Sequence, residues 1–136
     1  NIRNNGTGDS IYDDSGAKLT AAGVFTNGSD RNKKQNIRDI QYGLPELLRL
    51  HPVAYNTKVD GRADIGFIAQ EVKEVIPEVV YGEEGNMSLS YGQLTSVLTK
   101  AIQELKQQKD KEITELKARS EAQQKEIEAL KAKMVR

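Results

Sequence analysis

The fold of this chain is decided by the stretch Ile65-Gly66-Phe67-Ile68-Ala69-Gln70-Glu71-Val72-Lys73-Glu74-Val75-Ile76-Pro77. Its first four residues are apolar or small, and they predict a short strand. From Ala69 onward, Val72, Val75 and Ile76 recur at helical spacing, and Pro77 ends the predicted helix. A strand that leads directly into a short helix is typical of a small mixed α+β domain.

The sequence on both sides of this stretch supplies the other elements of that domain. A short helix is predicted over 43–50 and a strand over 53–59. Further on, 79–81 and 87–89 flank a Gly-containing turn and predict a hairpin. We therefore expect an α+β core over residues 29–92.

A long helix is predicted for residues 93–136, since no Gly follows Gly92 and no Pro interrupts, and Ser90 can cap it. Its first part carries a broad apolar stripe that we expect to pack on the small core: Leu94, Val97, Leu98, Ala101, Ile102 and Leu105. The stripe then narrows to a coiled-coil seam with a stutter near Lys109: Ile102, Leu105, Lys109, Ile113, Leu116, Ser120, Gln123, Ile127, Leu130 and Met134. Such a seam needs neighbouring helices, because a lone helix is marginal in water. The periodicity alone leaves dimer and trimer open.

The composition of the 136-residue chain excludes several classes of function. Twenty basic and twenty acidic residues cancel, which argues against a nucleic-acid or anionic-membrane surface. The chain has no cysteine, so it has no disulfide, thiol nucleophile or Cys-ligated zinc, and we expect no cofactor. No signal peptide or membrane span is apparent. Because the sequence begins at Asn1, we expect it to be the tail of a larger protein.

Residues 1–28 form a Gly-, Asn-, Asp- and Ser-rich segment with short strand signals at 10–12 and 18–25. Asp14-Ser15-Gly16 between them predicts a turn. The segment has too few apolar residues to close a core alone. It is either disordered or packed against other chains as interleaved strands at the end of a fibre, and we favour the second interpretation.

The junction between Gly28 and Ser29 is a candidate site of self-cleavage. The Ser29 hydroxyl is placed to attack the carbonyl of Gly28, which has no Cβ to shield it and can take strained backbone angles. A serine hydroxyl needs a base, and no Ser-His-Asp triad is apparent, because His51 before Pro52 is the one histidine and suits a structural role. A lysine can serve instead, and two lysines, Lys33 and Lys34, follow Ser29 within five residues.

The roles of the residues around Ser29 stay open at this point. A lysine has an ordinary pKa of about 10.4, so it acts as a base only when it is desolvated or lies near another cation. Lys33 could supply that cation. Alternatively, Lys34 stays charged and stabilises the oxyanion or protonates the leaving amine. Asp30 either orients the lysine or caps the local turn.

Several short motifs follow one another between residues 29 and 106: Ser29-Asp30, Lys34, Ile37, Leu47-Leu48-Arg49-Leu50, Tyr55, Gly66-Phe67-Ile68-Ala69-Gln70-Glu71-Val72, Val75, Pro77-Glu78-Val79-Val80 and Leu89-Ser90-Tyr91. In this order they resemble the C-terminal intramolecular chaperone domain of phage endosialidases, tail fibres and neck appendages, a module also found in the myelin regulatory factor. Such domains trimerise, guide the folding of an upstream triple-stranded β fibre, and cut themselves off before the serine. The resemblance therefore favours a homotrimer.

The resemblance implies a division into a fibre-end β segment (1–28), an α+β chaperone core (29–92) and a helix in a trimeric coiled coil (93–136). It implies a single-turnover, serine-type self-cleaving endopeptidase with Ser29, Lys34 and Asp30 at its site, and the upstream fibre of the same chain as partner. The domain would act in the host cytoplasm during virion assembly and be released, while the fibre stays in the virion. The rival function is a non-cleaving trimerisation cap, and a receptor-binding tip is less favoured because exposed aromatic residues are few.

Overall fold

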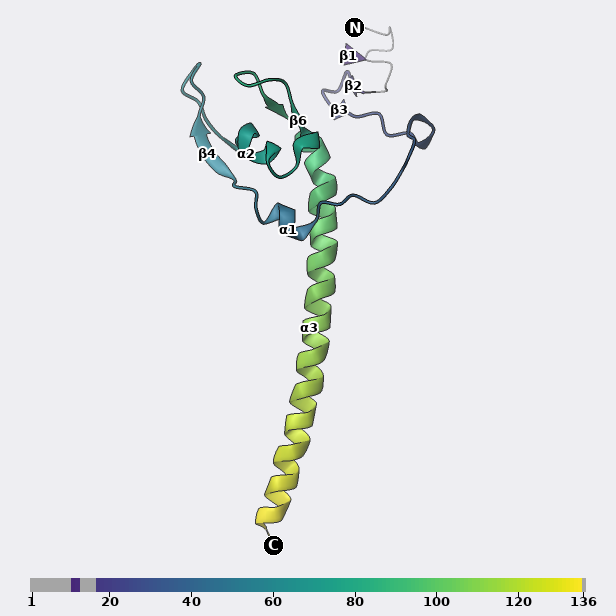
Figure 1. The fold of residues 1–136 in the computed structure, drawn as a ribbon, viewed down its shortest axis with the longest axis vertical. Coiled ribbons are helices and arrows are strands. Elements are labelled where there is room, and N and C mark those ends of the chain that lie inside the picture. The colour runs from purple at the N-terminus through teal and green to yellow at the C-terminus, as the bar shows by residue number, and fades with distance from the viewer. Residues whose placement is uncertain (1–10, 13–16, 136) are drawn as a thin grey trace. The chain divides into compact units, whose positions relative to one another are not determined.

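The computed structural model describes residues 11–12 and 17–135, which fall into two compact units, 1–39 and 40–136 (Figure 1). The described part of the first unit holds three short strands and a 3₁₀ turn. The second holds a small mixed domain and the long helix. The fold is thus α+β, as predicted, with small sheets and one dominant helix.

The strands of the first unit form one antiparallel sheet in the order β1-β2-β3: β1 (Ile11–Tyr12), β2 (Lys18–Leu19) and β3 (Phe25–Thr26). The predicted strand over 18–25 is broken by a turn at Gly23, whose φ of +76° suits glycine. The turn predicted at 14–16 lies outside the described residues. From 17 to 39 no residue is buried, so the described part of this unit closes no core of its own.

The small domain of the second unit contains the helices and strands that the sequence predicts, with different bounds: the strand expected over 65–68 spans 63–66 instead, and a 3₁₀ turn that was not predicted follows at 77–79. Its elements are α1 (Leu44–Leu47), β4 (Val53–Asn56), β5 (Ala63–Gly66), α2 (Ala69–Lys73), the 3₁₀ turn η2 (Pro77–Val79), β6 (Val80–Tyr81) and β7 (Ser88–Leu89). Strand β4 pairs with β5, with Val53 opposite Gly66, and β6 pairs with β7. Residues 57–62 form the loop that connects β4 to β5. The Thr57 amide closes this loop by donating to the Arg62 carbonyl, 2.9 Å away.

Helix α3 runs from Tyr91 to Met134 as one uninterrupted element (Figure 1). Ser90 occupies its N-cap position, but the expected side-chain cap is absent, so that prediction is wrong. The Ser90 amide instead donates to the Val79 carbonyl (2.8 Å), and the Ser90 carbonyl accepts from Gln93 (3.2 Å). Among the described residues, no helix has the length and apolar character needed to cross a membrane.

The core of the small domain consists of six buried side chains: Val72, Ile76, Val79, Leu94, Val97 and Ala101. The last three come from the first turns of α3. The expectation that the whole stripe packs on this core is wrong for Leu98, Ile102 and Leu105, which are 43%, 64% and 41% exposed. At about 100° of rotation per residue, the centre of this exposed set lies about 70° around the helix from the centre of the buried set. Helix α3 therefore has two adjacent apolar faces, and the described residues bury only one of them.

Candidate active site

Ser29 and Lys34 form a close polar pair within the first unit. The Lys34 ammonium Nζ donates a hydrogen bond to the Ser29 hydroxyl Oγ over 2.8 Å. The two residues are five positions apart, so the geometry between them depends only on the short stretch that connects them. The sequence analysis singled out both residues, and in the structure Lys34 Nζ and Ser29 Oγ are in hydrogen-bonding contact.

The connecting stretch is a 3₁₀ turn, η1 (Arg31–Lys33), which folds the chain back toward Ser29. Asp30 is its N-cap: the carboxylate Oδ1 accepts from the Asn32 amide over 2.7 Å. The turn closes when the Lys34 amide donates to the Arg31 carbonyl, 3.0 Å away. Of the two roles open for Asp30, its contacts match the cap, since the carboxylate holds the turn that delivers Lys34.

Every residue from 27 to 41 is exposed, so the Ser29–Lys34 pair faces water in the single chain. A charged lysine in this position polarises the serine oxygen and can stabilise negative charge as it develops. To act as a base the amine must be neutral, and removal from water favours the neutral form. Gly28 is not among the described glycines with positive φ, which are Gly23, Gly61, Gly82 and Gly85. The candidate bond therefore carries no strain of that kind.

Other polar residues that the sequence singled out lie in the second unit. His51 Nδ1 is 3.5 Å from Glu71 Oε2, with both side chains more than half exposed. The Gln70 amide donates to Glu84 Oε1 over 2.9 Å. These contacts tie α2 to neighbouring loops, in keeping with the structural roles expected for His51. Across the described residues, no group of acidic or histidine side chains could hold a metal ion.

Two carboxylates that sequence reasoning missed anchor the start of the second unit. The Tyr42 hydroxyl donates to both Glu78 oxygens at 2.7 and 2.9 Å, and this bond raises the pKa of Tyr42. The Leu44 amide, at the start of α1, donates to Glu104 Oε2 on α3 over 2.8 Å. Gly43, between them, is buried and lies against the Glu104 carboxylate. The hydrogen bond from Tyr42 to Glu78 joins residues 36 positions apart, and the one from Leu44 to Glu104 joins residues 60 positions apart. No local sequence pattern predicts contacts over such separations.

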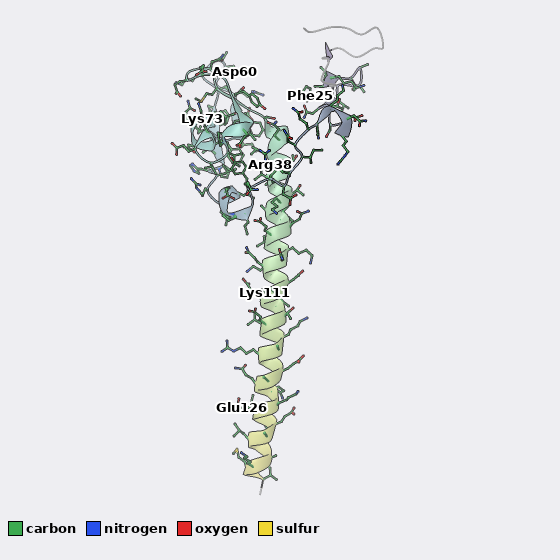
Figure 2. All side chains as sticks on the ribbon, turned by 45° about the vertical axis from the view of Figure 1, so that its right-hand side comes forward. Phe25, Arg38, Asp60, Lys73, Lys111 and Glu126 are labelled. Carbon is green, nitrogen blue, oxygen red and sulfur yellow. The ribbon has the colours of Figure 1, made fainter. Side chains whose placement is uncertain are left out.

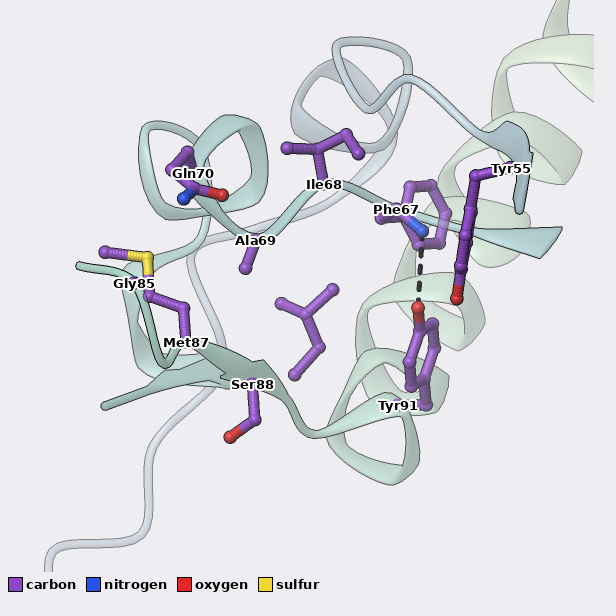
Figure 3. Close-up of a pocket in the computed structure, with 10 residues that line it drawn as sticks. Tyr55, Phe67, Ile68, Ala69, Gln70, Gly85, Met87, Ser88 and Tyr91 are labelled. Atoms are coloured by element: carbon purple, nitrogen blue, oxygen red, sulfur yellow. Dashed lines mark hydrogen bonds between the residues drawn. The ribbon is translucent and has the colours of Figure 1, made fainter. Parts of the chain in front are cut away.

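A shallow pocket of about 410 Å³ opens between β4, the residues that lead from β5 into α2, β7 and the first turn of α3 (Figure 3). Tyr55, Phe67 and Tyr91 form its aromatic side, and the Phe67 amide donates to the Tyr91 hydroxyl over 3.2 Å. The Phe67 and Tyr91 rings stack with centroids 6.2 Å apart. Its lining contains no charged side chain, so it provides no acid, base or anion-binding group.

A comparison with protein families matches residues 29–81 to a peptidase family described as chaperone of endosialidase. The match covers less than half of the chain. It begins at Ser29, includes Lys34 and continues through β6. It confirms that the middle of the chain is similar to this chaperone domain. Among the curated proteins, no relative of the chain was found.

Proposed function

We propose that this chain, whose residues 29–81 match the endosialidase chaperone family, is a self-cleaving intramolecular chaperone. It forms a homotrimer, assists the folding of an upstream trimeric phage fibre or tailspike, and is released by a cut between Gly28 and Ser29. The observation that supports this proposal best is the 2.8 Å contact between Lys34 Nζ and Ser29 Oγ at the first residue of the matched region.

The proposed reaction has two steps. Ser29 Oγ bonds to the carbonyl carbon of Gly28 as the bond from that carbon to the Ser29 nitrogen breaks, and the hydroxyl proton passes to the freed amine. Water then attacks the same carbon, which leaves a carboxylate on Gly28 and restores the Ser29 hydroxyl. A neutral Lys34 would relay the proton as a base, whereas a charged Lys34 would stabilise the oxyanion.

The exposure of the pair supports a dependence of cleavage on assembly. In the single chain Ser29 and Lys34 are both in contact with water. Exclusion of water strengthens the electrostatic interactions in a site and fixes the reacting groups. We therefore expect trimer formation to precede the cut, so that the chaperone leaves only after the fibre has been built.

The chaperone role is supported by the lack of buried residues in the described part of the first unit. Strands that bury nothing within one chain need burial from neighbouring chains. The exposed stripe of α3 can bring three copies together and so supply those neighbours. Deletion of the residues after Ser29 before folding should leave the upstream fibre aggregated or monomeric, whereas removal after folding should leave it intact.

The decisive experiment is a time course of the purified protein on a denaturing gel, with N-terminal sequencing of any fragment. We expect a fragment that begins at Ser29. Ser29→Ala should abolish it without loss of the trimer, Ser29→Cys should retain some cleavage, and Lys34→Ala should slow it far more than Lys33→Ala. A single intact band from wild-type trimers would instead support a non-cleaving cap.

The pH dependence of that time course separates the two roles of Lys34. If the neutral amine is the base, the first-order rate rises with pH up to the ionisation of the lysine. If the ammonium stabilises charge, the rate falls in the same range. Cleavage by unassembled monomers at the rate of trimers would contradict the proposed coupling to assembly.

A further inference from the structure

Two residues join the small sheet of the first unit to the 3₁₀ turn η1. Strand β3 ends at Thr26, and Asn27 and Gly28 follow before Ser29; Figure 2 labels Phe25, which precedes them in the chain. Asn27 and Gly28 are exposed and belong to no helix or strand. Within the described chain, neither of them takes part in a hydrogen bond. The backbone at this junction is therefore in contact with water and is held only by its covalent bonds.

An asparagine that is followed by glycine can lose its side-chain amide without an enzyme. The glycine nitrogen bonds to Cγ of the asparagine, and the side-chain amide takes the proton of that nitrogen and leaves as ammonia. Water then opens the cyclic imide at either carbonyl, which gives an aspartyl residue or a β-linked isoaspartyl residue. The reaction needs an attacking nitrogen that no Cβ shields and a backbone that can rotate. The exposed, unbonded pair of Asn27 and Gly28 meets both requirements.

The other described asparagines differ from Asn27 in the residue that follows. Each of them precedes a residue with a Cβ: Asn32, Asn36, Asn56 and Asn86. The Asn56 side chain is in addition held in place, because it donates to the Gly61 carbonyl over 2.8 Å. Asn36 is as exposed as Asn27, but it precedes the β-branched Ile37, which hinders the attacking nitrogen. The one other Asn-Gly pair of the sequence, at 5–6, lies outside the described residues.

Loss of the Asn27 amide places a carboxylate next to the carbonyl that the proposed cut attacks. The oxygen of that carbonyl becomes negative as Ser29 Oγ bonds to the carbon of Gly28, and a second negative charge nearby opposes this step. The carboxylate acts against Lys34 in either of its two roles. It favours the charged form where a neutral base is required, and it competes for the ammonium where the ammonium stabilises the oxyanion. The isoaspartyl product also lengthens the backbone by one atom before Gly28.

We propose that Asn27 is a site of spontaneous deamidation that competes with the cut after Gly28, so that chains which stay uncut lose part of their capacity for self-cleavage. The modification rests on the exposed Asn-Gly pair, and its effect on cleavage rests on the proposed function. After the cut, Gly28 is the last residue of the upstream product, so later deamidation no longer affects release. The junction thereby limits the time during which the chain cleaves at its full rate.

The modification is measured in the full chain with Ser29→Ala, which cannot be cut by the proposed route. Trypsin digestion recovers Asn27 in the peptide 19–31 and Asn36 in the peptide 35–38. After incubation of the intact protein at mildly alkaline pH, mass spectrometry detects the replacement of an amide by a carboxyl group in each peptide. Chromatography separates the aspartyl and isoaspartyl forms. Asn36 serves as the internal control in the same sample.

We expect Asn27 to be converted at least about tenfold faster than Asn36, because glycine leaves the attacking nitrogen open whereas isoleucine is branched at Cβ. Gly28→Ala in the same background should slow the conversion several-fold. The φ of Gly28 is not positive, so alanine suits its backbone, and circular dichroism checks that the variant is folded. Conversion of Asn27 at the rate of Asn36, or a rate that Gly28→Ala leaves unchanged, would overturn the inference.

The effect on the cut is measured by comparing Asn27→Asp with Asn27→Gln, which keeps a neutral amide at the junction. In a time course on a denaturing gel, the aspartate variant should be cut about fivefold more slowly, as expected for one unit charge about 4 Å from another in water. High salt should narrow the difference. Equal rates in the two variants would overturn the proposed competition. Wild-type chains that are never cut would overturn the proposed function and the competition with it, whereas the Ser29→Ala chain would still test the modification of Asn27.

Discussion

Replacement of Gly43 by alanine probes the contact that joins α1 to the long helix. A Cβ on residue 43 would lie 2.6 Å from Glu104 Oε1 and 2.7 Å from Glu104 Cδ, closer than carbon atoms approach in proteins. The φ of Gly43 is −146°, outside the left-handed region, so the cost arises from this contact. The Glu104 side chain must rotate away, and its bond to the Leu44 amide is then lost.

The size of the effect follows from the bond that is lost. A hydrogen bond to a charged group contributes about 1.5–3 kcal/mol to stability, and the lower end applies because the Glu104 side chain is 31% exposed. Gly43→Ala and Glu104→Ala should each cost about 1.5 kcal/mol of unfolding free energy. Because both act on one bond, the double variant should cost about the same as Glu104→Ala alone, with a coupling near 1.5 kcal/mol.

The assay is urea unfolding followed by circular dichroism at one protein concentration, since assembly makes stability depend on concentration. Glu121→Ala, a truncation of an exposed glutamate on the same helix, serves as control and should change stability by less than about 0.5 kcal/mol. Additive losses near 3 kcal/mol in the double variant would refute the reasoning. So would a Gly43→Ala variant as stable as wild type.

Three further outcomes follow from the described contacts. Asp30→Asn should keep the cap of the 3₁₀ turn and most of the cleavage rate, whereas Asp30→Ala should slow cleavage several-fold on a gel time course; equal losses would mean that the charge itself is required. Ile76→Ala, at a site 1% exposed, should cost about 2–5 kcal/mol of domain stability, while Ile102→Ala should mainly lower association, as measured by sedimentation. The pKa values of Glu46 and Asp60 are lowered, by the Gly43 amide and the Thr57 hydroxyl respectively. Their stabilisation is therefore present above their ordinary values near 4.5 and 3.8 and is lost as pH falls through the lower folded values. Urea midpoints should drop over that range, and less steeply in Glu46→Gln.

What the sequence predicted well depends on neighbours along the chain. The pairing of Ser29 with Lys34 needs only one 3₁₀ turn between them, and Asp30 is a typical capping residue directly before that turn. The strand-to-helix stretch that ends at Pro77 was identified by periodicity and a helix breaker. In such cases a few residues contain both the signal and the structure it specifies.

What the sequence did not predict depends on contacts between distant segments. The two apolar faces of α3 are continuous in sequence, and only the position of η2 and α2 decides that Leu94 is buried while Leu98 is exposed. Likewise, Glu104 reads as one of many helix-surface glutamates, although its carboxylate holds an amide 60 residues away. Hydrophobic periodicity indicates that a helix face is apolar, but it does not indicate which element packs against that face.

Every residue of α3 from 105 to 134 is exposed, so this part of the helix contributes no buried side chain to the small domain that precedes it. For protein engineering, this exposed part of α3 is a segment that other coiled-coil sequences could replace. In the proposed homotrimer, a different parallel trimeric coiled coil could replace the helix after Glu104 in the same heptad phase, and whole heptads could be added or removed, without a change to any core side chain. Insertion of one or two residues would instead rotate the distal part of the helix by about 100° or 200° relative to the small domain. In the proposed trimer, the heptad phase at the junction, rather than the identity of the coiled coil, would then determine which faces of the three domains lie opposite one another.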